Sequence, residues 1–391
     1  MKILITTDWY EPVVNGVVTS VRTLAAQLRR RGHQVRILTL SRTCHSYLEN
    51  QVYYAGSVGV GCIYPEARLK LPASGDCIRQ ILDWGPEIIH SQCEFSTFFL
   101  AKRIAAELQI PIVHTCHTIY EEYTHYFSPR KSWGRGLART VTRRISGQVK
   151  AMIVPSRKVQ KIMEGYGVTC PVWVIPTGID LSRCGAKEEA GQRELIRKRY
   201  GIGPEMTVLL YVGRLAKEKN VEELLSLQQM AGKGQSVLMI TGDGPCREEL
   251  ERQVRERNLE DQVIFTGMVP PEAVAGYYQA GDLFVTASRS ETQGMTYAEA
   301  LASGLPLLCR KDGCLEGVVT QRVNGWQYEN SGEFLEFLTE WRGKTDEERG
   351  RMGWMAKKSA GMFSAEAFGR EVEKVYEQAK RNGEIPIARW A

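Results

Sequence analysis

The feature that most constrains this chain is an alternation of short apolar segments with amphipathic segments of helical length, which runs through the sequence in two separate blocks. Short buried strands that alternate with helices are typical of parallel sheets whose two faces are both covered by helices. The sequence therefore predicts an α/β protein with two doubly wound, Rossmann-like domains. No internal repeat or low-complexity segment argues for a different architecture.

The first block opens with a β-α-β unit, in which an apolar strand is followed by a helix and a second strand. Its predicted strands lie at residues 3–6, 34–40, 88–90, 112–114 and 152–154, and its first helix carries Val17, Val21, Leu24 and Leu28 on one face. The second block predicts strands at 208–212, 237–240, 263–265, 283–286 and 306–309, with helices at 221–231, 245–257, 271–280 and 295–303. A final helix at 365–380 has Phe368, Val372, Val375 and Tyr376 on one face.

A polar stretch between Asp180 and Tyr200 separates the two blocks. We expect an N-terminal domain at residues 1–182 and a C-terminal domain at 183–367, facing each other across a cleft. In such sheets ligands bind beyond the carboxyl ends of the strands. The residues directly after each predicted strand are therefore the first candidates for a functional site.

Cysteine usage and hydropathy indicate a cytoplasmic protein. The ten cysteines are spread along the chain without a C-x-x-C pair, so neither a disulfide framework nor a zinc site is expected. No stretch approaches the roughly 20 apolar residues needed to span a bilayer, and the first six residues resemble a strand more than a signal peptide.

The net charge is unevenly distributed between the two blocks. Residues 1–150 contain 19 Lys or Arg and 11 Asp or Glu, whereas the remainder contains 32 and 34. A basic first half suggests an anionic partner or surface for the first domain. Nucleic acid is not the expected partner, because basic and aromatic residues are not interleaved beyond one helix.

Two cations follow the first strand of the second block. Gly213 and Arg214 come directly after residues 208–212, and Lys219 lies five residues further on. A strand-end glycine lets a ligand approach the backbone, and the guanidinium and ammonium groups both suit phosphate oxygens. These residues predict a diphosphate site, although a pair of solvated loop cations remains an alternative.

A second candidate follows the strand at 283–286, where a helix is predicted to begin near Met295. Its first amides, together with Gly294, make an anion site at the helix N-terminus. Glu291 precedes this helix and Glu299 lies inside it, so each carboxylate can accept hydrogen bonds from vicinal hydroxyls of a sugar. The alternative is an acidic residue that complements the helix dipole and one solvated glutamate.

The order and spacing of these motifs resemble the retaining GT-B glycosyltransferases of family four, and the resemblance covers nearly the whole chain. It rests on Gly213-Arg214 with Lys219 and on Glu291 with Glu299. The supporting segments are Asn15-Gly16-Val17-Val18, Val154-Pro155-Ser156, Ile175-Pro176-Thr177-Gly178-Ile179-Asp180, Gly242-Asp243-Gly244-Pro245 and Phe265-Thr266-Gly267. The resemblance implies a GT-B fold whose C-terminal helix, about residues 368–391, crosses back to the first domain.

The resemblance also implies a role for each matching position in binding a nucleotide-sugar donor. Arg214 and Lys219 would bind the diphosphate, Glu299 the ribose and Glu291 the sugar hydroxyls. The other implied donor contacts are Gly16, Gly213, Gly242, Val269 near the base, and Gln293, Gly294, Met295 and Thr296 at the helix start. The implied catalytic residues are His117, Arg214, Lys219 and Glu291.

One segment departs from the common family pattern. Many relatives have Phe-Gly-Leu where this chain has Gln293-Gly294-Met295, followed by Thr296. This variant resembles the branch that glycosylates diacylglycerol, which implies a UDP-hexose donor, with glucose as the first choice, and a membrane lipid acceptor. It also implies peripheral association with the inner face of the cell membrane.

The chain contains no Asp-x-Asp motif, so a metal-bridged diphosphate is not expected and no cofactor is predicted. Charge on the departing diphosphate would be met by Arg214, Lys219 and helix amides. The resemblance implies retention of the anomeric configuration through front-side attack, in which the leaving phosphate accepts the acceptor's proton.

The first domain contributes His117, which follows the strand at 112–114 and is therefore expected at the cleft. A structural histidine at a strand end is the alternative, and a metal site with His114 is not supported by further ligands. The aromatic segment after it resembles the acceptor border of the diacylglycerol branch, and its candidate residues are Tyr120, Tyr123 and His125.

Residues 130–150 contain seven Lys or Arg and no acidic residue. Arg135, Arg139 and Arg143 recur every four residues on one helical face, whereas Leu137, Val141 and Ile145 form a stripe on the other side. Such a helix suits an anionic membrane surface. It also suits a helix that docks its apolar side on the sheet and leaves the arginines in water, and both can hold together.

Two alternative functions stay open at this level. One is a family-four glycosyltransferase that acts on a soluble or polyprenyl-linked saccharide. The other, from a different class, is a regulatory protein that binds a nucleotide sugar without catalysis. An assay of transfer to diacylglycerol in vesicles distinguishes the first alternative from a lipid glycosyltransferase. Detectable hydrolysis of a UDP-sugar would exclude the second.

Overall fold

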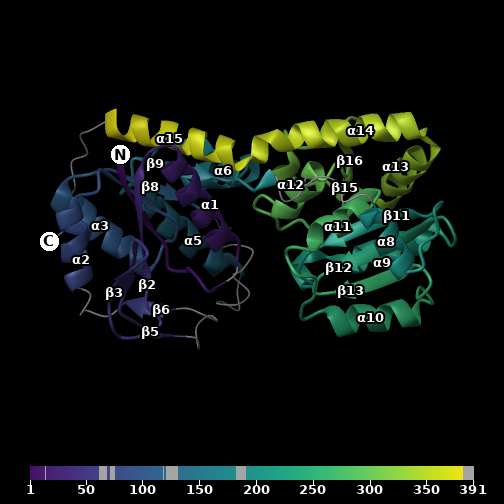
Figure 1. Cartoon of the computed structure of the whole chain (residues 1–391), viewed down its shortest axis with the longest axis horizontal. Helices are drawn as coiled ribbons and strands as arrows, with labels where there is room; N and C mark the ends of the chain where they lie inside the picture. The colour runs from purple at the N-terminus through teal and green to yellow at the C-terminus, as the bar shows by residue number, and fades with distance from the viewer. Residues whose placement is uncertain are drawn as a thin grey trace. The chain divides into compact units, whose positions relative to one another are not determined.

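The computed structural model describes residues 1–13, 15–60, 68–70, 75–117, 119, 131–181 and 191–381, without the side chains of 75 and 131–135. The chain forms two compact units (Figure 1). The first contains Met1–Gly178 together with Ala365–Ala391, and the second contains Ile179–Ser364. The predicted α/β class with two Rossmann-like sheets is confirmed, and the chain returns to its first unit at the C-terminal end.

The first unit is built on an eight-stranded sheet in the order β10-β9-β8-β7-β1-β2-β4-β3. All neighbouring strands are parallel except β3 and β4. The strands are β1 (Lys2–Thr6), β2 (Gln34–Leu40), β3 (Tyr47–Glu49), β4 (Val52–Ala55), β7 (Ile88–Ser91), β8 (Ile112–Thr115), β9 (Ala151–Val154) and β10 (Val172–Val174). A separate antiparallel pair consists of β5 (Ser57–Gly59) and β6 (Arg68–Lys70).

Two apolar layers cover the faces of this sheet. On one face, α1 (Gly16–Arg30) and α15 (Ala365–Arg381) pack their buried leucines, valines and aromatic residues against β1 and β2. On the other face lie α2 (Gly75–Trp84), α3 (Ser96–Leu108) and α6 (Arg157–Tyr166). The remaining described helix is α5 (Lys131–Ser146), which contacts α6. The C-terminal helix is therefore part of the first unit's core.

The second unit contains a six-stranded parallel sheet in the order β13-β12-β11-β14-β15-β16. Its strands are β11 (Thr207–Val212), β12 (Ser236–Thr241), β13 (Val263–Gly267), β14 (Leu283–Thr286), β15 (Leu307–Arg310) and β16 (Gly325–Tyr328). Its helices are α8 (Gln192–Arg199), α9 (Val221–Ala231), α10 (Arg247–Glu256), α11 (Val274–Ala280), α12 (Met295–Ala302), α13 (Ser331–Gly343) and α14 (Asp346–Ser359). Its described residues also form the 3₁₀ turns η2 (Lys217–Lys219), η3 (Gly313–Leu315) and η4 (Ala360–Phe363).

Each sheet reverses its strand order at one central position. In the first unit the reversal lies between β1 and β7, and in the second it lies between β11 and β14. At such a point the connections after the two strands diverge to opposite sides and leave a crevice for a ligand. Most residues that the sequence singles out follow these strands or their neighbours. Within the described helices, none is long and apolar enough to cross a bilayer.

Candidate functional site

The carboxyl ends of β11 and β14 carry the candidate residues of the second unit. Gly213 and Arg214 follow β11, and Glu291 lies in the segment between β14 and α12. The Arg214 side chain is exposed, with no hydrogen bond to any described residue, while the backbone N–H of Gly213 donates to Thr241. Because β11 and β14 are neighbours in the sheet, these two segments leave it from adjacent strand ends.

Two further glycines allow the strand-end turns to pack directly on one another. Gly242, after β12, has a φ of +134°, and a Cβ there would lie 2.0 Å from the carbonyl oxygen of Gly213. A Cβ on Gly244 would lie 2.4 Å from the carbonyl oxygen of Leu215. Gly242 is therefore required by backbone packing beneath the predicted diphosphate site.

Lys219 and Glu291 form an ion pair across the reversal point. Lys219 ends η2, and its Nζ lies 2.5 Å from Glu291 Oε1, with both side chains about one-fifth exposed. The Ser290 hydroxyl donates to the carbonyl oxygen of Glu218 at 3.1 Å and ties the same two segments together. The structure therefore joins one predicted phosphate ligand to one predicted sugar ligand.

At the N-terminus of α12 the backbone packs closely against an aromatic side chain of the same helix. Gly294 is the N-cap with a φ of +74°, and a Cβ there would lie 2.3 Å from the ring of Tyr297. No side chain caps this helix start, so the first amides, at Met295 and Thr296, are not satisfied by a capping residue. Gln293, just before the helix, is buried.

Glu299 lies one turn into α12 and has a different environment from Glu291. Its Oε2 accepts a hydrogen bond of 2.8 Å from the hydroxyl of Tyr278 on α11. Burial raises the pKa of Glu299, and the hydrogen bond from Tyr278 partly opposes that rise. Tyr278 was not among the candidates from the sequence, because an apolar helix face hides its hydroxyl in the pattern. Val269, which follows β13, packs beside the core, and Met268 is 75% exposed.

In the first unit, His117 follows β8 and contacts the residue that follows β7. Its Nε2 lies 2.7 Å from Oε1 of Gln92. Burial lowers the pKa of His117 to about 4, with a further lowering by His114 and an opposing effect of Glu94. The ring is therefore neutral at pH 7. Gly16, the first residue of α1, is exposed and follows the Asn15 cap, whose side chain accepts from Val18.

Further polar groups, buried or partly buried, lie at this edge of the sheet. Asp8, after β1, accepts a 2.7 Å hydrogen bond from the backbone of Thr97, and burial raises the pKa of Asp8 to about 6 despite that bond. His114 Nε2 lies 3.5 Å from Glu94. Among the described residues, no group of three or more His, Cys, Asp or Glu could hold a metal ion.

Asp8, Gln92 and Glu94 were not among the candidates from the sequence. Each of them lies within three residues of the end of β1 or β7, the two strands that flank the reversal point. A search of every polar residue after a predicted strand would have found them. Their polar neighbours, however, become visible only once the strand order is known.

The helix α5 presents both arginines and apolar residues to solvent. Arg139 and Arg143 are exposed, Leu137 is 67% exposed and Val141 is 38% exposed. Only Ile145 of the expected apolar stripe is buried, because the helix docks through Ala138, Thr142, Ile145 and Ser146. Tyr120, Tyr123 and His125 lie outside the described residues, as does the side chain of Arg135.

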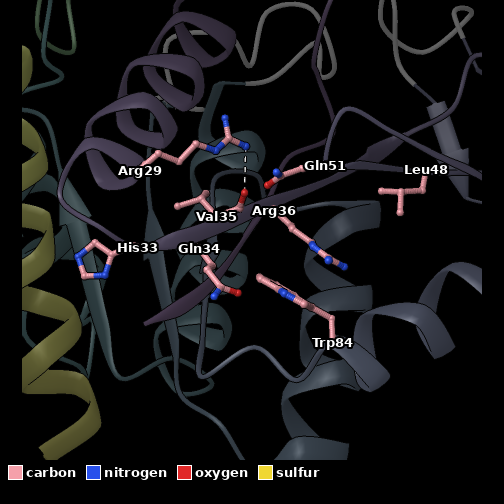
Figure 2. Close-up of a pocket in the computed structure, with 8 residues that line it drawn as sticks. All are labelled: Arg29, His33, Gln34, Val35, Arg36, Leu48, Gln51 and Trp84. Atoms are coloured by element: carbon pink, nitrogen blue, oxygen red, sulfur yellow. Dashed lines mark hydrogen bonds between the residues drawn. The ribbon is translucent and has the colours of Figure 1, made fainter.

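A pocket of about 370 Å³ lies at the opposite, amino edge of the first sheet (Figure 2). It is lined by Arg29, Arg36, Trp84 and neighbouring residues of β2 and β3, and the Arg36 guanidinium lies 4.6 Å from the Trp84 ring centroid. Arg29 donates to the carbonyl oxygen of Val35 at 2.9 Å. This pocket is distinct from the strand-end residues described above.

Comparison with known proteins gives matches over both units. The family described as Glycosyltransferase Family 4 matches residues 14–183, and Glycosyl transferases group 1 matches residues 192–357. An alpha-monoglucosyldiacylglycerol synthase of Streptococcus pneumoniae is 34% identical over 347 residues, which cover 86% of this chain and 78% of that protein. A protein of the same name from Acholeplasma laidlawii is 28% identical over 390 residues, 96% of each chain.

Solved structures show the same fold. The structure of Anabaena Alr3699/HepE in complex with UDP superposes with a TM-score of 0.74 at 16% sequence identity, covering 97% of this chain and 100% of that one. At this identity the likeness concerns the fold, which is that of GT-B glycosyltransferases.

Proposed function

The chain belongs to glycosyltransferase family four, and from that membership we propose that it transfers glucose from UDP-glucose to diacylglycerol with retention of the anomeric configuration. The observation that carries the proposal is the ion pair of Lys219 with Glu291 at the β11–β14 reversal point. An exposed Arg214 directly after β11 and an α12 start without a side-chain cap accompany it. The choice of sugar and lipid follows the names of the relatives from Streptococcus pneumoniae and Acholeplasma laidlawii.

In this proposal the diphosphate of the donor binds between Arg214 and the first amides of α12. Arg214 is exposed without a protein partner among the described residues, so its fork of donors is available to phosphate oxygens. The α12 amides have no capping side chain, and a helix N-terminus attracts anions. Lys219 adds a third positive group while it orients Glu291.

The two carboxylates then bind different parts of the donor. Glu299 is partly buried and already accepts one hydrogen bond from Tyr278 at Oε2, which leaves its other oxygen to accept from a ribose hydroxyl. Glu291, held by Lys219 at Oε1, accepts from hydroxyls of the sugar through its second oxygen. The base lies near Val269, where main-chain atoms follow β13.

The chemistry needs charge stabilisation at the leaving diphosphate more than a strong base. As the bond between the anomeric carbon and the phosphate oxygen breaks, negative charge grows on the oxygens that face Arg214, Lys219 and the α12 amides. The leaving phosphate takes the proton of the attacking hydroxyl on the same face of the sugar. His117 of the first unit, neutral at pH 7, acts as a hydrogen-bonding partner of a substrate hydroxyl.

A lipid acceptor requires the enzyme to work at a membrane surface, and α5 has the composition for it. Leu137 and Val141 are exposed on the same helix as Arg139 and Arg143. Apolar side chains that insert among headgroups, together with arginines that pair with lipid phosphates, are typical of helices lying on anionic membranes. Peripheral membrane association through α5 is therefore part of the proposal.

The function is tested by product analysis. Vesicles containing diacylglycerol are incubated with the protein and with UDP-glucose, UDP-galactose or GDP-mannose in parallel. We expect α-linked glucosyldiacylglycerol from UDP-glucose, identified by mass and by the anomeric proton signal. Transfer only to a soluble or polyprenyl-linked saccharide, or UDP-glucose binding without turnover, would contradict the proposal.

Membrane binding through α5 is tested by sedimentation with anionic vesicles. Replacing Arg139 and Arg143 by Gln should reduce binding, and the wild-type protein should lose binding as salt rises, because the headgroup attraction is screened. The matched control replaces Arg252 and Arg255, two exposed arginines of α10, by Gln. Equal binding of both double variants would exclude α5 as the contact surface.

A further inference from the structure

Gln92 occupies a fixed position beside His117. It is the first residue after β7, it is 2% exposed, and its backbone N–H donates to the carbonyl oxygen of Thr6 at 2.8 Å. Because β7 pairs with β8 in parallel register, the residues that follow the two strands lie side by side. The backbone of Gln92 is therefore anchored to the edge of the sheet.

The contact between the two side chains defines which ring nitrogen of His117 carries a proton. Gln92 Oε1 lies 2.7 Å from His117 Nε2, and a carbonyl oxygen can only accept a hydrogen bond. With the Gln92 amide in this orientation, the proton of the neutral His117 ring lies on Nε2. In a neutral imidazole the other nitrogen, Nδ1, keeps its lone pair and can only accept.

The charged and titratable neighbours of His117 affect whether its ring is protonated, but they do not determine which ring nitrogen carries the proton of the neutral form. Burial keeps the ring neutral, Glu94 favours its protonated form, and His114 opposes protonation. His90, which also interacts with His117, is itself bound on both sides, by Tyr376 at Nδ1 and by Thr115 at Nε2. Of these neighbours, Gln92 is the one within hydrogen-bond distance of the His117 ring.

We propose that Gln92 is a positioning residue that holds His117 in the Nε2–H tautomer and thereby presents Nδ1 as a hydrogen-bond acceptor for a substrate hydroxyl. The inference rests on the proposed function for the identity of that hydroxyl, which belongs to a sugar or lipid alcohol. A hydroxyl that donates to Nδ1 gains electron density on its oxygen, whereas the opposite tautomer would offer it a donor. Gln92 thus decides that the substrate hydroxyl donates and His117 accepts in this hydrogen bond.

A purely structural role makes a different prediction. A buried amide that only satisfies a core polar group would, when removed, lower stability and leave the ionisation of His117 and the pH dependence of activity unchanged. Removal of a positioning residue changes both the ionisation of His117 and the pH dependence of activity. Three variants separate the two roles: Gln92→Leu removes the acceptor, Gln92→Glu keeps an acceptor and adds charge, and Gln228→Leu removes a buried amide bonded to Ser236 in the second unit.

The first measurement is independent of activity. In full-length protein labelled with ¹⁵N-histidine, with the His117 signals assigned through His117→Asn, we expect a protonated Nε2 and an unprotonated Nδ1. Gln92→Leu should convert this to a tautomer mixture, and Gln92→Glu should raise the midpoint of protonation, because a carboxylate stabilises the imidazolium. A wild-type ring protonated at Nδ1, or an unchanged spectrum in Gln92→Leu, would overturn the proposal.

The second measurement uses glucosyl transfer to diacylglycerol vesicles. Gln92→Leu should lower kcat by about 10- to 100-fold, as for other residues that orient a functional histidine, with KM for the donor within about twofold. Gln92→Glu should recover part of this loss at high pH and shift the acidic limb of the pH profile upward. Gln228→Leu should keep the wild-type profile. A Gln92→Leu enzyme with wild-type kcat and pH profile would refute the inference while leaving the proposed function intact.

The two hypotheses fail separately. If the wild-type protein transfers no sugar, the proposed function is wrong, and the histidine spectra alone then decide whether Gln92 sets the tautomer. If transfer occurs and the spectra of wild-type and Gln92→Leu proteins are identical, only the role of Gln92 is wrong.

Discussion

Asp8, at the carboxyl edge of the first sheet, is a single residue whose ionised side chain is destabilised by burial. The Asp8 carboxyl is largely shielded from water, and it accepts a hydrogen bond of 2.7 Å from the backbone N–H of Thr97. Burial raises its pKa to about 6, which means that the carboxyl binds a proton more tightly in the folded state than in the unfolded state. Polar groups kept at such a cost are typical of functional sites.

Replacing Asp8 by Asn should therefore stabilise the protein in a pH-dependent way. The folded pKa of Asp8 is above its unfolded value, so its favourable contribution is present below about pH 4 and is lost as the pH rises towards 6. At pH 8 we expect Asp8→Asn to increase the free energy of unfolding by about 1–3 kcal/mol. Urea unfolding at pH 4 and pH 8 measures this, and an equal difference at both values would contradict it.

Gly242 shows how one backbone position limits the choice of residue. A Cβ at Gly242 would lie 2.0 Å from a carbonyl oxygen, and φ is +134°. We expect Gly242→Ala to lower the free energy of unfolding by at least about 3 kcal/mol. The control is Gly232→Ala, where φ is +80° but no atom lies within 4 Å, with an expected loss of about 1 kcal/mol. Similar losses in both variants would show that the packed turns can move apart.

At the scale of elements, the pair α11–α12 is joined by the hydrogen bond from Tyr278 to Glu299. This bond lowers a pKa that burial raises, so Tyr278→Phe should raise the pKa of Glu299 further. If the Glu299 carboxylate binds the ribose, UDP affinity should fall as the pH is lowered and Glu299 takes up a proton. In Tyr278→Phe this fall should begin at a higher pH than in the wild type. Calorimetric titration with UDP between pH 5 and 8 tests this. Parallel pH profiles would separate Glu299 from donor binding.

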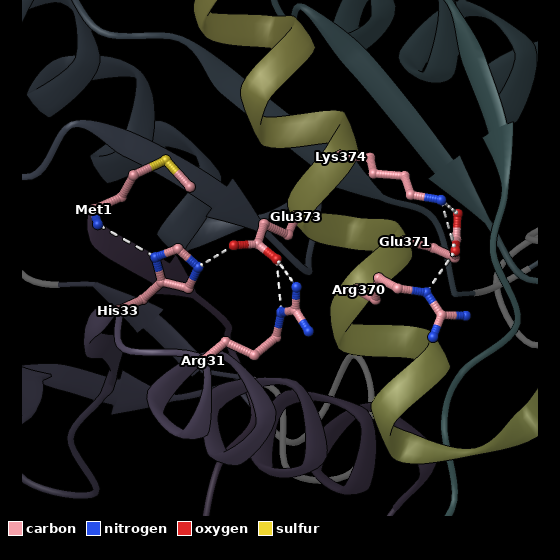
Figure 3. Close-up of polar contacts among 7 residues, drawn as sticks. All are labelled: Met1, Arg31, His33, Arg370, Glu371, Glu373 and Lys374. Carbon is pink, nitrogen blue, oxygen red and sulfur yellow. Dashed lines mark hydrogen bonds and ion pairs between the residues drawn. The ribbon is translucent and has the colours of Figure 1, made fainter.

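The C-terminal helix α15 carries two glutamates, one with partners outside the helix and one with partners on the helix itself (Figure 3). Glu373 receives hydrogen bonds from Arg31 Nε at 2.6 Å and from His33 Nε2 at 2.7 Å, whereas Glu371 pairs with Lys374 and Arg370 on its own helix. Burial alone would raise the pKa of Glu373, but the bonds from Arg31 and His33 outweigh it and lower that pKa.

Glu373→Ala should therefore lower the free energy of unfolding by about 1–3 kcal/mol at pH 7, because it leaves Arg31 and His33 without their partner. Glu371→Ala, two residues away, should change it by less than about 0.5 kcal/mol, as expected for exposed ion pairs. The lowered pKa of Glu373 implies that its contribution is present above the unfolded pKa and is lost as the pH falls through the folded value. Thermal unfolding of both variants at pH 7 and pH 4 measures the difference.

At the scale of the whole molecule, the first unit is discontinuous in sequence. Residues Phe368, Val372, Val375 and Tyr376 of α15 are at most 3% exposed and belong to the same core as β1 and β2. Tyr376 also donates to or accepts from the buried His90 at 2.6 Å. The second unit, Ile179–Ser364, has its own cores on both faces of its sheet.

Truncation after Ser364 should consequently unfold the first unit and leave the second unit folded. Residues 179–364 expressed alone should fold and bind UDP, since the proposed donor ligands all come from this unit apart from Gly16. Limited proteolysis and circular dichroism of the truncated chain check the first expectation, and calorimetry of the isolated unit checks the second. A truncated chain with two intact units would show that α15 only covers a surface.

The sequence by itself determined the strands and the position of the candidate residues along them. The predicted strands at 34–40 and 283–286 coincide with β2 and β14, because both segments are rich in apolar and β-branched residues. Six strands of three or four residues were not predicted, namely β3, β4, β5, β6, β10 and β16. All residues of β3 are exposed and those of β10 are half-buried, so these two lack the apolar pattern of a core strand. That Arg214, Glu291 and His117 follow strands was therefore readable from local pattern.

Only the tertiary structure decided which of these residues meet. The ion pair of Lys219 with Glu291 joins residues 72 apart, and the contact of Gln92 with His117 joins residues 25 apart. Both depend on strand order, which local hydrophobic periodicity does not encode. Burial is likewise a property of the packed molecule, and it makes Asp8 a carboxyl with a raised pKa and leaves Leu137 exposed. Sequence pattern thus places a side chain at a sheet edge, while long-range packing selects its partners and its charge.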